Sequence, residues 1–121
     1  SIFEARVISR DTDFDLMHLE FNGGQFIVPD NALPIESLVR IRVAARDVSI
    51  SKKRQSDTSI LNIFPAVVEE IVPEGNAQVI VRLTLNGVVL LACLTRKSSA
   101  SLKLDKGSSV FVQVKSVAIL N

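Results

Sequence analysis

The 121-residue sequence lacks tryptophan and tyrosine, and it contains one cysteine, one histidine and five glycines. A single cysteine cannot form an internal disulfide, which suits a reducing compartment such as the cytosol. With so few histidines and cysteines, we find no nucleophile triad, no zinc ligand set and no catalytic carboxylate pair. The glycines do not form a phosphate-binding loop. We therefore expect this segment not to be an enzyme, to need no cofactor and to hold no metal site.

The chain also lacks an excess of charge and a long apolar run. Fourteen basic and thirteen acidic residues give a formal net charge of +1, whereas nucleic-acid binders cluster a basic excess. No apolar stretch reaches the length of a membrane span, so we expect a soluble domain without direct membrane insertion. The first residues read SIFEARV without an initial Met or a signal peptide. We expect the chain to be a fragment of a longer protein.

The isolated Cys93 and His18 are not candidates for chemistry. Cys93 lies in the apolar stretch VVLLACL, which predicts a buried and inert thiol. His18 lies in MHLEF beside Glu20, where an alternating pattern places it towards solvent.

Apolar and polar residues alternate with a period of two along most of the chain. In NAQVIVRLTL, residues 76–85, the odd-numbered positions from 77 onwards are apolar and only Ile80 interrupts the polar face, which is typical of a half-buried strand. The sequences NGG at 22–24 and NG at 86–87 each separate two apolar runs and predict hairpins. One short helix is predicted over 96–107, with Thr95 or Ser98 as N-cap and Gly107 as its end. The fold class is therefore all-β.

Three pairs of segments repeat in the same order. FEARVIS (3–9) is similar to FPAVVEE (64–70), LEFNG (19–23) to LTLNG (83–87), and RVAARDVSI (42–50) to FVQVKSVAI (111–119). The repeat predicts two related β units, residues 1–54 and 55–121, with the short helix in the second. Neither unit is large enough for much core of its own, so we expect the units to pack on each other or on a partner chain.

Both copies share a change of phase in the apolar pattern. It falls at Arg46–Asp47 in the first copy and at Lys115–Ser116 in the second. A β-bulge at these pairs would present a cation and free N–H groups to a ligand. Alternatively, the strand crosses here from one sheet to another, as in small barrels. The two interpretations are compatible.

Four segments carry a resemblance to a known family. They are VRIRVAARDVSIS (39–51), TSILNIFPAVVEEI (58–71), residues 76–107 and VQVKSVAI (112–119). Together they resemble the C-terminal regulatory domain of the ATP-binding subunit of molybdate ABC transporters, which is related to the small molybdate-binding proteins called molbindins. The resemblance implies two oligonucleotide/oligosaccharide-binding (OB)-like barrels packed together, and molybdate or tungstate as the ligand.

The resemblance also implies site residues. A molbindin motif reading Ser-Ala-Arg-Asn corresponds to Ser59, Ile60, Leu61 and Asn62. This carries over the Ser59 hydroxyl, the backbone N–H groups of Ile60 and Leu61, and Asn62 as an orienting amide. Lys115 and Ser116 correspond to the family's Lys-Ser/Thr pair, and Thr95 and Arg96 to a junction between strand and helix. Leu61 replaces the arginine of that motif, which removes a guanidinium from the implied oxyanion site.

The function that the resemblance implies is feedback control of molybdate import. The partners would be a second copy of the domain, the ATPase domain of the same parent chain and the transporter's membrane subunit, at the cytoplasmic side of the inner membrane. No Walker motif lies in these residues, so ATP hydrolysis would belong to the parent. Two alternatives remain open: a dimerisation module without ligand from another importer's ATPase, and a single-strand nucleic-acid binder. The second would need exposed aromatics, but the six Phe mostly occupy apolar-phase positions.

Overall fold

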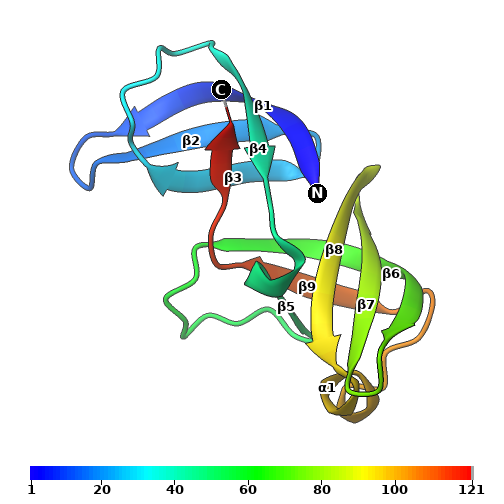
Figure 1. Cartoon of the computed structure of the whole chain (residues 1–121). Coiled ribbons are helices and arrows are strands. Elements are labelled where there is room, and N and C mark those ends of the chain that lie inside the picture. Colours follow the sequence, from blue (N-terminus) through cyan, green and yellow to red (C-terminus); the bar gives the residue numbers. More distant parts are fainter. Residues whose placement is uncertain (121) are drawn as a thin grey trace.

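The computed structural model describes residues 1–120, which form two five-stranded antiparallel sheets (Figure 1). The first sheet has the strand order β10-β4-β1-β2-β3, and the second has the order β5-β9-β6-β7-β8. The strands of the first sheet are β1 (Ile2–Asp11), β2 (Leu16–Phe21), β3 (Gly24–Pro29), β4 (Leu38–Arg42) and β10 (Ala118–Leu120). Those of the second sheet are β5 (Val48–Ser51), β6 (Asn62–Glu74), β7 (Gln78–Leu85), β8 (Val88–Thr95) and β9 (Ser109–Val114). The all-β prediction with two OB-like units is confirmed.

Alternation in the sequence becomes alternation in burial. Along β7 the side chains of Val79, Val81, Leu83 and Leu85 are buried and those between them are half-buried or exposed. The strand pair β7–β8 closes at Asn86 and Gly87, whose φ values of 47° and 85° are those that an Asn-Gly turn supplies. Between β2 and β3 the turn brings Phe21 opposite Gly24. Both predicted hairpins are therefore confirmed.

The two long strands carry a register shift at equivalent positions. Pairing slips between Val7 and Ser9 in β1 and between Val68 and Glu70 in β6. At each shift the same loop contacts recur: Val7 exchanges hydrogen bonds with Ser37 and Glu36, and Val68 with Ser108 and Gly107. This shared irregularity supports the repeat that the sequence indicates.

The phase changes in the sequence mark the points where the chain moves between sheets. After β4 the chain passes through a single 3₁₀ turn, Ala45–Asp47, and enters the second sheet as β5. After β9 it passes through residues 115–117 and enters the first sheet as β10. The crossing interpretation is confirmed. The predicted β-bulge at the two polar pairs is wrong, because both pairs lie outside the strands and the register shifts lie in β1 and β6. Each sheet thus contains one strand from the other side of residue 54, the boundary expected between the units: β10 in the first sheet and β5 in the second.

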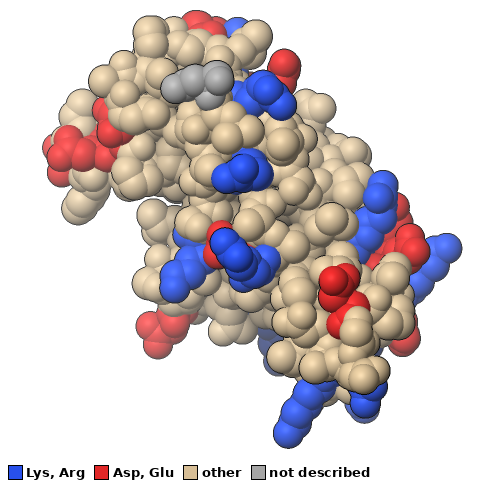
Figure 2. All heavy atoms as spheres, viewed as in Figure 1, with Lys and Arg blue, Asp and Glu red and all other residues tan. Residues whose placement is uncertain are grey.

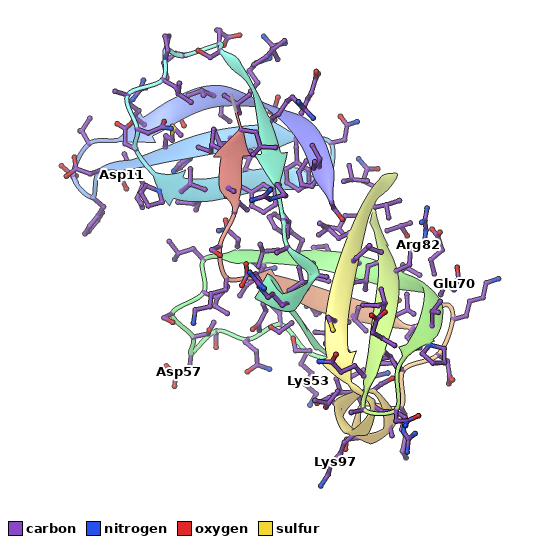
Figure 3. All side chains as sticks on the ribbon, viewed as in Figure 1. Asp11, Lys53, Asp57, Glu70, Arg82 and Lys97 are labelled. Atoms are coloured by element: carbon purple, nitrogen blue, oxygen red, sulfur yellow. The ribbon has the colours of Figure 1, made fainter. Side chains whose placement is uncertain are left out.

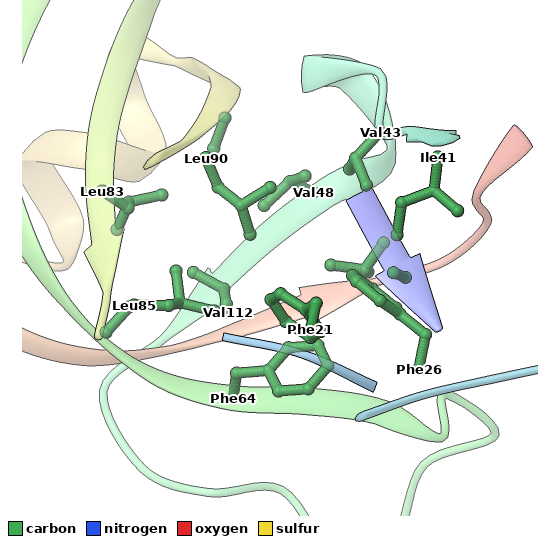
Figure 4. Packing of buried hydrophobic residues seen from close by; sticks show 14 of the residues in the cluster. Phe21, Phe26, Ile41, Val43, Val48, Phe64, Leu83, Leu85, Leu90 and Val112 are labelled. Carbon is green, nitrogen blue, oxygen red and sulfur yellow. The ribbon is translucent and has the colours of Figure 1, made fainter. Parts of the chain in front are cut away.

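Four phenylalanines join the two units in one core, and Figure 4 shows three of them, Phe21, Phe26 and Phe64. Phe3, Phe21 and Phe26 from the first sheet stack with ring centroids 4.7 to 5.9 Å apart. Phe64 from β6 meets the rings of Phe21 and Phe26 edge-on at 5.4 and 5.1 Å. Aromatic edges and faces attract at such distances, so the units pack on each other as expected.

The helix is shorter than predicted. α1 covers Arg96–Ser101, because Lys103 takes a left-handed φ of 52° that stops it before Gly107. Thr95 is the N-cap, and its Oγ1 accepts the N–H of Ser98 at 3.0 Å. Within residues 1–120 there is no helix of the length and apolarity that a membrane crossing requires.

Two exposure predictions need correction. Cys93 is half-buried, because β8 is an edge strand of the second sheet and its outward face is only partly covered. His18 is also half-buried, because it lies between Ser9 of β1 and Ile27 of β3.

Candidate functional site

The two crossing segments lie against each other between the sheets. The backbone N–H of Lys115 donates to the carbonyl oxygen of Asp47 at 2.9 Å. The Ser116 hydroxyl donates to Oδ2 of the same residue at 3.2 Å. The polar pair of each repeat is therefore in contact with the pair of the other, and Figure 2 shows basic side chains on the surface in this region.

A hollow of about 460 Å³ lies beside this contact. The loop 58–61, the start of β6, Lys115 and the outer parts of β2 and β3 form its walls. Its lining residues are Leu16, Ile27, Pro29, Thr58, Ser59, Ile60, Leu61, Asn62 and Lys115. Five predicted site residues thus share one hollow: residues 59–62, and Lys115, which lies more than fifty positions later in the sequence.

Asn62 fixes the position of the loop at the bottom of the hollow. Its side chain is buried, with 7% of its surface exposed. Oδ1 accepts the N–H of Ile27 at 2.7 Å, and Nδ2 donates to the carbonyl oxygen of Ile27 at 3.1 Å. β3 is the edge of the first sheet, where backbone groups lack a strand partner. The Asn62 amide supplies that partner and holds residues 59–61 at a fixed place.

The predicted hydrogen-bond donors differ in how free they are. The N–H of Ile60 donates to Oγ1 of Thr58 at 3.2 Å, and the Ser116 hydroxyl is occupied by Asp47. Ser59 and Lys115 are exposed at the hollow. Leu61 is 59% exposed on its wall and contributes an apolar surface where a guanidinium would have added charge.

Thr95 and Arg96 lie elsewhere. Thr95 caps α1 and lines a second hollow together with Lys97, and Arg96 is the first residue of that helix. Neither residue lines the hollow of Ser59 and Lys115. Ser116 adjoins this hollow through Lys115 but is not among its lining residues.

Sequence reasoning missed the wall that the first unit contributes. Leu16, Ile27 and Pro29 belong to β2 and β3 and come to the hollow through the packing of the two sheets. They are apolar or half-buried strand residues without a local motif, so no sequence signal distinguished them. Asp47, the acceptor for Ser116, was visible only as half of a phase change.

The arrangement is suited to holding a small anion. It combines the hydroxyl of Ser59, the backbone N–H of Leu61 and the ammonium group of Lys115 in a concave site that is open to solvent. Charge-assisted hydrogen bonds from such donors are stronger than neutral ones. Among the described residues, no group of three or more metal-ligating side chains is found.

Comparisons with known proteins give a consistent result. The family model of the TOBE domain matches residues 58–120. The molybdenum import ATP-binding protein ModC of Thiobacillus denitrificans is 42% identical over 98% of this chain and 33% of its own length. The protein of the same name from Methylococcus capsulatus is 38% identical over 99% of this chain and 34% of its own length. The chain thus spans about one third of these relatives.

A solved structure shares the fold along nearly the whole chain. It is the cytoplasmic molybdate-binding protein ModG in a form with molybdate bound, with a TM-score of 0.83. The alignment covers 98% of this chain and 94% of that chain at 21% sequence identity. At this identity the likeness shows the fold: two OB-like units with the same arrangement.

Proposed function

The chain belongs to the TOBE domain family, and from that premise we propose that it is the oxyanion-binding regulatory domain of a molybdate importer's ATP-binding subunit. The observation that carries the proposal is the hollow that brings Ser59 and Lys115 together. The relatives named for molybdenum import and the fold of a molybdate-binding protein support the choice of ligand.

Molybdate or tungstate, each a tetrahedral dianion, is held by the free donors of the hollow. Ser59 donates its hydroxyl, Leu61 its backbone N–H and Lys115 its ammonium group. The N–H of Ile60 is shared between Thr58 and the anion, and Asn62 acts through the position of the loop, because its amide is occupied by Ile27. Thr95 and Arg96 are not needed for this site.

One lysine leaves a dianion only half neutralised within a single chain. Burying uncompensated charge is costly, and Leu61 provides none. The remaining charge comes from a second copy of the domain that covers the open side of the hollow, where Leu61 is already exposed. Ligand and dimer are therefore linked in this proposal.

Regulation follows from that linkage. Molybdate that accumulates in the cytoplasm stabilises one arrangement of two regulatory domains and holds the attached ATPase domains in a non-productive geometry. The ligand shifts this equilibrium only by its difference in affinity for the two arrangements. ATP hydrolysis and contact with the membrane subunit belong to the parent protein, which lies at the cytoplasmic face of the inner membrane.

The test is an isothermal titration of the domain with molybdate, repeated in excess sulfate, with solution mass measured before and after. We expect binding that survives sulfate, with one dianion or fewer per chain. Lys115→Ala and Ser59→Ala should each weaken it by about tenfold or more, since a hydrogen bond to a charged group contributes about 1.5–3 kcal/mol.

Two matched variants act as controls. Lys53→Ala removes a lysine from the loop that contains Ser59, and Ser109→Ala removes an exposed hydroxyl from β9. Neither residue lines the hollow. Both variants should bind molybdate as the unmodified domain does. Equal losses in control and site variants, or a monomer with and without ligand, would contradict the proposal.

A second candidate is a dimerisation module that binds no ligand, from the ATPase of another importer. It is favoured by the internal partners of two predicted donors, the N–H of Ile60 and the hydroxyl of Ser116, and by Leu61. A dimer that gives no heat with molybdate or tungstate would select this candidate.

A further inference from the structure

The two ends of the molecule carry opposite charge, although the net charge is only +1. We call the loops 11–15 and 30–37 of the first unit the acidic tip. They contain Asp11, Asp13 and Asp15, and also Asp30 and Glu36, which pair with Arg10 and Arg6. We call the region around α1 the basic end, which contains Arg96, Lys97, Lys103 and Lys106 with Asp105 as its acid. Figure 3, in which Asp11 and Lys97 are labelled, shows these regions at opposite ends, and Figure 2 shows acidic and basic side chains there in the same view.

An aromatic side chain projects from the acidic tip. Phe14 is 76% exposed, whereas the other five phenylalanines are buried or half-buried. It lies between the carboxylates of Asp13 and Asp15. An exposed aromatic ring is unfavourable in water, and aromatic residues are enriched at the centres of protein interfaces.

The backbone holds this ring outward. Oδ1 of Asp11 accepts the N–H groups of Asp13 at 3.1 Å and Phe14 at 3.3 Å. Asp15 has a left-handed φ of 54°, and its carbonyl oxygen accepts the N–H of Asp30 at 2.8 Å. The side chain of Phe14 is therefore presented by a fixed turn, which lowers the entropy lost when it becomes buried.

The basic end contains a hollow that matches this side chain. It has a volume of about 440 Å³ and lies between β5, the end of β8 and α1. Its apolar walls are Ile50, Leu94 and Leu102, and Lys97 lies on its lining together with several hydroxyl groups. An apolar floor beside a lysine is complementary to a phenyl ring flanked by carboxylates.

We propose that Phe14 of one copy docks into this hollow of a second copy, with Asp13 and Asp15 facing Lys97. Because the tip and the hollow lie at opposite ends of each chain, two antiparallel copies form the contact twice around a twofold axis. The inference rests on the homodimer of the proposed function and assigns residues to one of its contacts.

The size of the contact sets its strength. A phenylalanine buries about 150–250 Å², so two such contacts fall short of the 1,200 Å² or so of a stable interface. The docking by itself is therefore reversible and sensitive to salt, since exposed charge pairs are screened at about 8 Å in physiological salt.

Disulfide trapping of the full chain tests the contact, in a Cys93→Ser background so that no native thiol competes. One preparation carries Phe14→Cys and the other Ser101→Cys, a residue that lines the hollow. On mild oxidation without molybdate, the mixture should give a cross-linked dimer. A disulfide needs Cα atoms within about 7 Å, and the proposed docking brings residue 14 of one copy next to residue 101 of the other. Replacing Ser101→Cys by Ser56→Cys, an exposed site away from the hollow, is the control.

Charge exchange tests the same contact without thiols. Asp13→Lys and Lys97→Glu should each weaken dimerisation several-fold by sedimentation, and the two variants mixed in one sample should recover it. In the disulfide experiment, cross-linking no faster than in the Ser56→Cys control, or faster self-linking of Phe14→Cys alone, would overturn the proposal. In sedimentation, growth of the unmodified chain into long oligomers would also overturn it. If molybdate titration fails while the specific cross-link forms, the oxyanion function is wrong and the docking contact stands.

Discussion

Single residues in this fold have roles that their sequence position does not reveal. Asn62 has the appearance of a turn residue, yet it is the buried amide that completes the edge of β3. Glu36 is an exposed acid in a loop, yet it adopts a left-handed φ of 75°. For Glu36 the repeat gives the explanation, because Gly107 occupies the equivalent position and meets the same backbone demand.

The comparison of Glu36 with Gly107 gives a prediction. At the register shifts, the N–H of Glu36 donates to the carbonyl oxygen of Val7, and the N–H of Gly107 to that of Val68, each at 2.7 Å. Both donors have a positive φ, 75° for Glu36 and 90° for Gly107. For a non-glycine residue that conformation costs about 1 kcal/mol or more. Glu36→Gly should therefore be more stable to denaturant than Glu36→Ala by about 1 kcal/mol.

The alanine variant is the matched control for that comparison. It removes the same carboxylate, and with it the exposed ion pair with Arg6 at 3.2 Å, but keeps the strained backbone. The reciprocal change, Gly107→Ala, should destabilise by about 1 kcal/mol. Equal unfolding midpoints for the two Glu36 variants would show that the loop relaxes instead.

Whole elements were predicted well where one face is buried and poorly where backbone geometry decides. The alternation in 76–85 and the Asn-Gly turns carry enough information to place strands and hairpins. The helix ended early because Lys103 adopts a left-handed conformation that lysine rarely prefers. The resemblance placed Ser59 and Lys115 in one candidate site, and they do line one hollow; that the hollow binds an anion stays a prediction. Its wall from β2 and β3 depends on packing between the sheets, which leaves no local pattern in the sequence.

The loops of the acidic tip give a prediction at the scale of elements. Asp30 accepts the N–H of Ala32 at 2.9 Å and pairs with Arg10 at 3.0 Å. The hydrogen bond from Ala32, and then Arg10, lower the pKa of Asp30 below its ordinary value despite some desolvation. A lowered folded-state pKa means stability that is present above the unfolded pKa and lost as pH falls through the folded one.

Asp30→Asn should therefore be less stable than the parent chain at pH 7, and the difference should shrink as the pH falls below about 4. Thermal unfolding of both proteins between pH 2 and pH 7 measures it. Asp57→Asn, an exposed aspartate in another loop, controls for the loss of one charge. A difference that stays constant over this range would mean that Asp30 acts through shape and not through its charge.

At the scale of the whole molecule, the two units are interdependent. Each sheet takes its outermost strand from the other half of the sequence, β5 in one case and β10 in the other, and Phe64 packs among the aromatic rings of the first sheet. The division at residue 54 follows the repeat, but neither half contains a complete sheet. The repeat was visible in the sequence; the exchange of strands was visible only as a change of phase.

Fragments give the corresponding prediction. Peptides 1–54 and 55–121 should each be largely unfolded alone, since each lacks a strand and part of the shared core. Mixed, they should regain β structure and the unfolding transition of a single cooperative domain, measured by circular dichroism. If peptide 1–54 folds alone, β10 is dispensable for the first sheet.

The exchange of strands also orders events in time. Domains usually fold from the N-terminus as they are synthesised, but here the first sheet lacks β10 until the end of the second unit, Ala118–Leu120, has been made. The first unit must therefore wait with the exposed edge of β4 unpaired while the second is translated. That interval is when this chain is most open to pairing with the wrong strand, and a chaperone that shields β4 would act then.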